Sequence, residues 1–223
     1  QLHQKIAGVI EELYADRLDD QAERLAFHYG ESKDAEKALP HVIRSAERAA
    51  ARFANEEALH YYRRALGLAS RTQAAPEVRT RILIGLGDSQ THIGDFDGAA
   101  NSLRAAWELA RSAVASQMQA RQTAEIARRL GRGYERRGKY DEAMEWLESA
   151  LREINRDVSS GRAVERVRIY LEIGWVHYRR GNLDEAEHWR LRALEISEGL
   201  DYYAEMGSAY NGLAALHSHK GDW

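Results

Sequence analysis

The sequence contains no cysteine, only two prolines and only three phenylalanines among its 223 residues. Without cysteine the chain forms neither disulfides nor thiolate metal sites, which fits a cytoplasmic protein. The scarcity of proline, together with abundant alanine, leucine, glutamate and arginine, favours an all-α fold. No stretch approaches 18 consecutive apolar residues, so we expect no membrane-spanning segment and no membrane partner.

The charged residues nearly balance. Aspartate and glutamate number 35 and lysine and arginine 32, which gives a formal net charge of −3. A nucleic-acid-binding segment usually carries a basic excess, so we expect no nucleic-acid partner for this segment. Forty-four per cent hydrophobic and 30% charged residues are ordinary for a folded, water-exposed protein.

One stretch recurs along the chain. Residues 138–151, GKYDEAMEWLESAL, return 43 residues later at 181–194 as GNLDEAEHWRLRAL. A looser copy begins at Gly94 and a truncated copy at Gly221, so the glycines are 44, 43 and 40 residues apart. A recurring period of roughly 20–50 residues indicates a repeat architecture, in which each unit packs on its neighbours.

Helical periodicity runs nearly from end to end, and short polar turns divide the chain into about eleven helices. Small residues such as Gly131 allow the two helices of a pair to approach closely where they cross, and we expect Ala143, Leu147 and Ala150 to form the stripe that packs on the neighbouring pair. Gly138 and Gly181 suit the left-handed conformation that ends one helix before the next.

Two positions in the first part of the chain carry more specific expectations. Pro40 is tolerated near a helix start, so we expect the helix around it to begin later or to kink there. Asn55 is expected to cap the helix that follows it.

The Leu-Gly-x₂-Tyr pattern at residues 130–134, followed by Ala-x₃-Leu at 143–147, resembles the tetratricopeptide repeat. The resemblance is strong at 124–157 and 167–200, fair at 80–113 and weak at 35–70. It implies a single right-handed superhelical solenoid over residues 1–223, with antiparallel helices, a period of about 40–44 residues and clear repeats from residue 77 on. The period exceeds the usual ~34 residues, which is typical of long variants in bacterial signalling proteins.

Residues 1–70 resemble one junction in large bacterial multidomain regulators. The segments at 2–14, 22–29 and 35–58 are similar to the divergent helices that follow the ATPase and winged-helix modules of signal-transduction ATPases, which are often coupled to adenylate or guanylate cyclase or to transcription-regulator modules. This resemblance implies that an NTPase precedes the chain in its parent protein. No residue here matches the catalytic motifs of these enzymes, so we predict that this chain itself is not an enzyme.

Several candidate sites have simpler structural interpretations. Gly133 to Lys139 satisfies G-x₄-G-K, but a phosphate-binding loop needs a preceding strand and a hydroxyl where Tyr140 stands. His217 and His219 are two residues apart, whereas helical metal pairs use a spacing of four. We therefore predict no cofactor, no metal site and no catalytic residues.

The concave groove of the expected superhelix is the strongest candidate for function, because the first helix of each pair lines it. Arginine and aromatic residues together are frequent hot spots for protein partners. The expected groove and partner-binding residues are Arg128, Arg132, Arg136, Arg168, Leu171, Trp175 and Tyr178, beside Glu135. The alternative at these positions is that Trp175 packs internally and the arginines form a solvated face.

The leading functional hypothesis is a scaffold and sensor segment of a larger cytoplasmic signalling ATPase, binding a protein, a peptide or another domain of the same parent. One alternative is a sensor for a small molecule such as a sugar or metabolite. Another is a structural spacer or oligomerisation module, since the truncated repeat at Gly221 is expected to expose an apolar face and favour self-association, with Trp223 packed rather than solvated.

Overall fold

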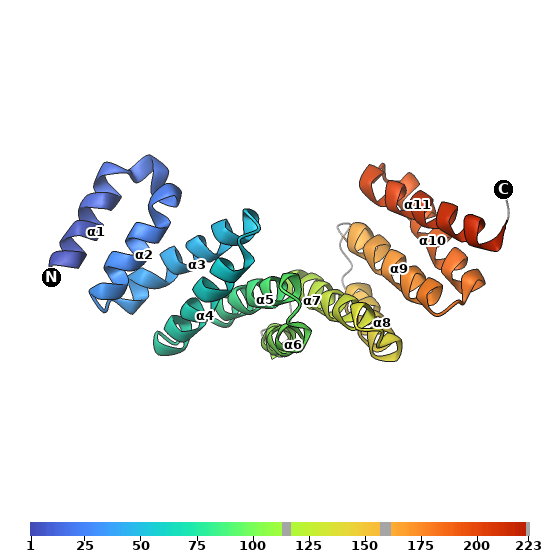
Figure 1. Cartoon of the computed structure of the whole chain (residues 1–223), viewed down its shortest axis with the longest axis horizontal. Helices are drawn as coiled ribbons and strands as arrows, with labels where there is room; N and C mark the ends of the chain where they lie inside the picture. Colours follow the sequence, from blue (N-terminus) through green and yellow to red (C-terminus); the bar gives the residue numbers. More distant parts are fainter. Residues whose placement is uncertain (113–116, 157–161, 222–223) are drawn as a thin grey trace. The chain divides into compact units, whose positions relative to one another are not determined.

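The computed structural model describes residues 1–112, 117–156 and 162–221 (Figure 1). These residues form eleven α-helices and one short 3-10 helix, η1 (Ala15–Gln21), with no strand among them. In chain order the α-helices are α1 (Leu2–Leu13), α2 (Ala22–Glu31), α3 (Ala35–Ala51), α4 (Asn55–Arg71), α5 (Pro76–His92), α6 (Phe96–Ser112), α7 (Gln117–Arg136), α8 (Tyr140–Arg156), α9 (Arg162–Arg179), α10 (Leu183–Glu198) and α11 (Tyr203–Lys220). The predicted fold class is confirmed. The predicted packing of Trp223 falls outside the described residues.

The chain divides into two compact units, residues 1–109 and residues 110–223. In the first unit, which we call unit 1, consecutive helices from α1 to α5 pack against one another, and α3 also contacts α5. Apolar side chains at helical spacing meet inside the unit, and Leu25, Tyr29, Val42 and Ile82 are fully buried there. Because each helix shares its apolar face with its neighbours, the hydrophobic core is a continuous layer along the helices.

The second unit, which we call unit 2, is built around α9. This helix contacts α7, α8, α10 and α11, while α7 pairs with α8 and α10 with α11. A Cβ at Gly131 would lie 2.7 Å from Cγ of Leu147, so α7 and α8 cross so closely that any side chain at that position would force Leu147 or one of the helices to shift. Ala143, Leu147 and Ala150 are all fully buried. Leu147 and Ala143 lie against Gly131 of α7, which is the other helix of the same pair rather than the neighbouring pair.

The glycines that mark the repeat period end helices in the left-handed conformation. Gly94, Gly138 and Gly181 have φ angles of +83°, +71° and +79°. After Gly138 the backbone N–H of Lys139 donates to the carbonyl of Tyr134 at 3.0 Å, which satisfies a carbonyl at the end of α7. The prediction for Gly138 and Gly181 is confirmed. Helix α7 precedes Gly138, so the G-x₄-G-K match is a helix–turn–helix corner.

Two local expectations were wrong. Helix α3 begins at Ala35 and continues through Pro40, which lies on an exposed face. The carbonyl of Glu36, which loses its intrahelical donor to the proline, also belongs to an exposed residue, so water can replace the missing bond. Asn55 is the first residue of α4 rather than its cap, since the N-cap is Ala54 and makes no side-chain hydrogen bond.

Phe53, in the turn between α3 and α4, holds the left-handed conformation without being glycine. Its φ angle is +60° and its side chain is 78% exposed, so little burial compensates for the backbone cost. The left-handed conformation costs a residue with a Cβ about 1–2 kcal/mol. Glycine avoids this steric cost, but it loses more backbone entropy on folding, which offsets part of the gain. We expect Phe53→Gly to raise the free energy of unfolding by about 0.5–1 kcal/mol in urea denaturation. Phe53→Ala, which keeps the Cβ, should leave stability near that of the natural protein; an equal gain from alanine would contradict the backbone explanation.

Candidate functional site

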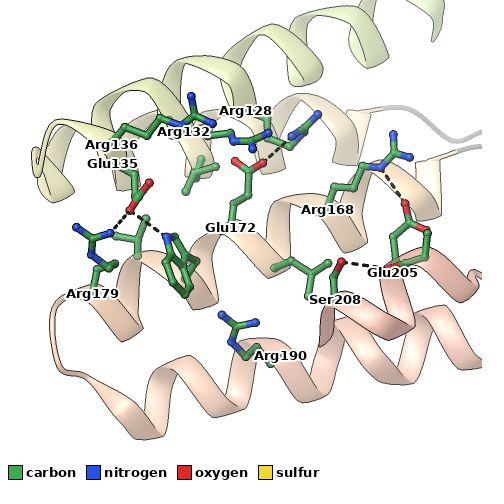
Figure 2. A pocket seen from close by; sticks show the side chains of 16 residues that line it. Arg128, Arg132, Glu135, Arg136, Arg168, Glu172, Arg179, Arg190, Glu205 and Ser208 are labelled. Carbon is green, nitrogen blue, oxygen red and sulfur yellow. Dashed lines mark hydrogen bonds and ion pairs between the residues drawn. The ribbon is translucent and has the colours of Figure 1, made fainter. Parts of the chain in front are cut away.

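A pocket of about 790 Å³ lies in unit 2, bordered by α7, α9 and α11 (Figure 2). Helices α8 and α10 each contribute one residue to its wall, Leu147 and Arg190. Its volume falls in the range that sites for small ligands and peptide side chains occupy. The residues that line it are Arg128, Gly131, Arg132, Glu135, Arg136, Leu147, Arg168, Leu171, Glu172, Trp175, Val176, Arg179, Arg190, Ala204, Glu205 and Ser208.

Six of the seven residues proposed from the sequence line this pocket. The exception is Tyr178, which does not face it. Its ring stacks on Trp175 with centroids 5.3 Å apart, and it packs against the apolar cluster that joins α10 to α11. Tyr178 therefore supports Trp175 from behind and helps to hold α11 against α9.

Arg128 is bound between two carboxylates of α9. Its Nε donates to Glu165 and its Nη1 to Glu172, each at 2.6 Å, and its side chain is only 13% exposed. Burial acts to lower the pKa of Arg128, but the two carboxylates outweigh that effect and hold the pKa above its ordinary value. This largely buried arginine thus links α7 to α9, and its charge is already compensated.

Trp175 is fixed in place yet accessible. Its Nε1 donates to Oε1 of Glu135 at 2.9 Å, and the same oxygen lies 3.4 Å from Nη1 of Arg179 (Figure 2). The indole is nevertheless 38% exposed and lines the pocket. A side chain held by a hydrogen bond loses little rotamer entropy when a ligand packs on it, so Trp175 is a pre-organised apolar wall.

The pocket is lined by more arginines than carboxylates. Arg168 pairs with Glu205 at 3.0 Å across α9 and α11, whereas Arg132 and Arg136 are exposed and form no hydrogen bond or ion pair with any described residue. Six arginines and three glutamates line the pocket, and Glu165 behind it brings the carboxylates to four. Six minus four leaves two positive charges uncompensated, so the pocket favours an anionic ligand.

Arg190 is the pocket residue that sequence reasoning missed. It projects from α10 into the pocket (Figure 2), is only 5% exposed, and makes no hydrogen bond or ion pair with any described residue. Its Nε is fully buried without a partner, and its guanidinium lies 5.9 Å from the centre of the Trp175 ring. Burial lowers the pKa of Arg190 from its ordinary value, an effect opposed by Tyr178.

A signal for Arg190 was present in the repeat itself. The second helices carry Ala-x₃-Leu at Ala99 and Leu103 and at Ala143 and Leu147, but after Ala186 the leucine position is occupied by Arg190. Both leucines are buried, and a Cβ at Gly174 would touch Cγ of Arg190 at 3.2 Å much as one at Gly131 would touch Leu147. An arginine at a repeat position that is otherwise a buried leucine is therefore a sign that the residue has a role other than packing.

Neither a metal site nor a membrane span is found in the parts of the chain that the structure describes. Over residues 1–112, 117–156 and 162–221, no group of three or more histidine or acidic side chains could hold a metal ion. Within the same ranges no helix combines the length and apolar character needed to cross a bilayer.

Two segments match family models of known proteins. Residues 127–161 match one model of the tetratricopeptide repeat and residues 166–200 match a second. These are the two stretches where the sequence resemblance is strongest, so the prediction is confirmed there. No curated protein sequence is significantly similar to the chain.

Solved structures share the fold at low sequence identity. BtubC (BKLC) from P. vanneervenii is 20% identical with a TM-score of 0.70, over 100% of this chain and 85% of that one. The apo form of the quorum sensor NprR from B. thuringiensis is 16% identical with a TM-score of 0.71, over 99% of this chain and 60% of that one. The Rap conjugation gene regulator of the plasmid pLS20, solved in complex with the Phr* peptide, is 17% identical with a TM-score of 0.61, over 86% of this chain and 55% of that one.

These likenesses show a common fold. Together with the family matches, they show that residues 127–161 and 166–200 are tetratricopeptide repeats in an all-α array of antiparallel helix pairs.

Proposed function

We propose that the chain is a non-enzymatic binding scaffold that holds an anionic segment of a peptide or protein partner in the pocket of unit 2. The observation that carries this proposal is the surplus of arginine around an accessible tryptophan. Tetratricopeptide repeats generally bind peptides, and one structure that shares the fold contains a bound peptide. That likeness is one of fold, so the choice of ligand depends on the pocket of this chain.

The pocket walls offer two kinds of contact. Arg132 and Arg136 are exposed and unpaired, so they can attract an acidic segment and pair with it without first breaking an internal ion pair. Trp175 and the half-buried Leu171 supply apolar surface beside them. A peptide with alternating acidic and apolar side chains would contact both the arginines and the apolar surface, so we expect an acidic, partly apolar peptide.

A small-molecule ligand is the second candidate, and the pocket volume of about 790 Å³ favours it. A sugar or metabolite with a carboxylate would use the same arginines. The two ligand classes separate in a thermal-shift screen, because a metabolite raises the melting temperature alone whereas a peptide partner is also retained by the immobilised chain. A purely structural spacer or self-associating module would show neither effect.

The cellular setting follows from the sequence resemblance of residues 1–70. We propose that the chain belongs to a larger cytoplasmic signalling ATPase, in which ligand binding to the repeats biases the ATPase between inactive and active states. Reading the coding sequence upstream of Gln1 tests this setting, since an ATPase and a winged-helix module are expected there. A different upstream module would contradict the setting and leave the pocket proposal standing.

Charge reversal at the edge of the pocket tests the scaffold function. We expect Arg132→Glu to weaken binding of fluorescein-labelled octaglutamate about tenfold in fluorescence anisotropy, because one attraction is lost and one repulsion gained near the surface. Arg152→Glu on α8 changes the net charge equally but does not line the pocket, so it is the matched control. Equal weakening by both variants, or equal binding of octaserine, would contradict the proposal.

A further inference from the structure

Arg190 holds a positive charge that no carboxylate among the described residues neutralises. Arg128, by contrast, donates hydrogen bonds to two carboxylates, those of Glu165 and Glu172. The Arg190 guanidinium has neither a carboxylate nor a carbonyl acceptor among the described residues, although the side chain is only 5% exposed. A buried unpaired charge destabilises the folded state, so a role in ligand binding would explain why an arginine occupies this position.

Helix α11 leaves space for this guanidinium. A Cβ at Gly212 would lie 1.5 Å from Nη1 of Arg190 and 2.0 Å from its Cζ, so only glycine fits at this point of α11 while Arg190 keeps its position. Two features that weaken packing therefore occur together: an arginine in a leucine position of the repeat, and a glycine within a helix directly against it. Leucine at the equivalent positions 103 and 147 shows that packing alone does not need the arginine.

From these contacts we infer that Arg190 is the buried anchor of the pocket and pairs with a single carboxylate of the bound ligand, an inference that rests on the proposed function. The guanidinium enters the pocket beside the Trp175 ring, so a carboxylate that reaches it passes along an aromatic wall (Figure 2). The planar fork of the guanidinium suits a carboxylate with two parallel hydrogen bonds.

Charge balance favours a carboxylate over a phosphoryl group. Arg190 supplies one positive charge in a nearly enclosed position, and a carboxylate supplies one negative charge, so the buried pair is neutral. A phosphoryl group carries about −1.5 to −2 near neutral pH and would leave negative charge buried beside Glu172. The exposed Arg132 and Arg136 then interact with other acidic groups of the partner at the edge.

The test measures binding of three labelled octapeptides to the whole chain. Octaglutamate amide carries side-chain carboxylates, octaserine acid carries a single C-terminal carboxylate, and octaserine amide carries none. The natural protein should bind at least one of the first two more tightly than the third. Arg190→Met keeps the stem and removes the charge, and it should abolish this carboxylate-dependent preference, a loss of at least about tenfold in affinity.

Arg192→Met is the matched control, since Arg192 lies two residues away on α10, stacks on Tyr170 and Trp189, and does not line the pocket. It should bind the three peptides as the natural protein does. A second readout separates an anchor from a packing residue: Arg190→Met should raise the melting temperature of the free protein, because a buried unpaired charge is replaced by an apolar side chain.

The outcomes are distinct. Unchanged carboxylate preference in a folded Arg190→Met protein would overturn the anchor and leave the proposed function intact. No carboxylate preference in the natural protein would overturn both. If Arg190→Met fails to fold, Gly212→Ala replaces it: its methyl group displaces only the end of the Arg190 side chain. Full carboxylate preference in Gly212→Ala would then overturn the inference.

Discussion

Replacing Arg128 with methionine is expected to lower the free energy of unfolding by about 3–5 kcal/mol, the largest single effect that we predict for this chain. The reason is the position of Glu172, whose only ion pair among the described residues is with Arg128 at 2.6 Å. Methionine fills much of the same volume but leaves that largely buried carboxylate without an ion-pair partner, and only the more distant charge of Arg132 still acts on it. Equilibrium urea denaturation at pH 7 measures the loss.

The loss should depend on pH in a defined direction. Burial raises the pKa of Glu172, and Arg128 opposes that rise. Without the arginine, the folded protein binds a proton at Glu172 more readily than the unfolded chain does. Protonation then favours the folded state, so the deficit is largest at neutral pH and shrinks as the pH falls toward about 4.5, the ordinary pKa of this carboxyl.

A double variant distinguishes lost electrostatics from lost packing. Arg128→Met/Glu172→Leu replaces the ion pair by apolar groups, and we expect it to recover most of the stability that the single variant loses. Glu165 keeps a second cation, since its Oε2 lies 3.8 Å from Nη1 of Arg168. A double variant as unstable as the single one, or a deficit that grows as the pH falls, would contradict this account.

The repeat architecture could be predicted because it depends on local patterns. Glycine at a fixed period requires a left-handed turn, and the observed φ angles of Gly138 and Gly181 match that requirement. Alanine and leucine at helical spacing marked Ala143, Leu147 and Ala150 of α8 as packing residues, and all three are fully buried. Such signals repeat, so an error in one copy is corrected by the next.

The details of the pocket could be predicted only in part. Helical spacing placed Trp175 and the arginines on one face, and the structure gathers six of the seven proposed residues around one pocket. The spacing carried no information on which arginines are paired: Arg128 forms ion pairs with carboxylates 37 and 44 residues away, while Arg132 forms no ion pair with any described residue. Arg190 lies on the second helix of its pair, at a position where the other repeats have a buried leucine. The prediction considered only the first helix of each pair as groove lining, so it did not include Arg190.

The close crossing of α7 and α8 is expected to make Gly131 intolerant of even one methyl group. A Cβ there would lie 2.7 Å from Cγ of Leu147 and 3.1 Å from the carbonyl oxygen of Ala143. The first atom is near the stem of a fully buried side chain and the second is backbone, so neither yields easily. Overpacking of this kind costs about 1–3 kcal/mol. Alanine regains up to about 1 kcal/mol of helix propensity, and we expect Gly131→Ala to be destabilised by about 1–2 kcal/mol.

Gly133 is the matched control, two residues along the same helix. Nothing lies within 4 Å of a Cβ built at Gly133, so Gly133→Ala gains helix propensity without a clash. We expect it to raise the free energy of unfolding by about 0.5–1 kcal/mol, which separates the two variants by about 1.5–3 kcal/mol in urea denaturation. Because both substitutions add the same methyl group to one helix, propensity cancels and the difference isolates the crossing. Equal stability of the two variants would mean that α7 and α8 can separate by several tenths of an ångström without loss, and the small residues of the repeat would then need another explanation.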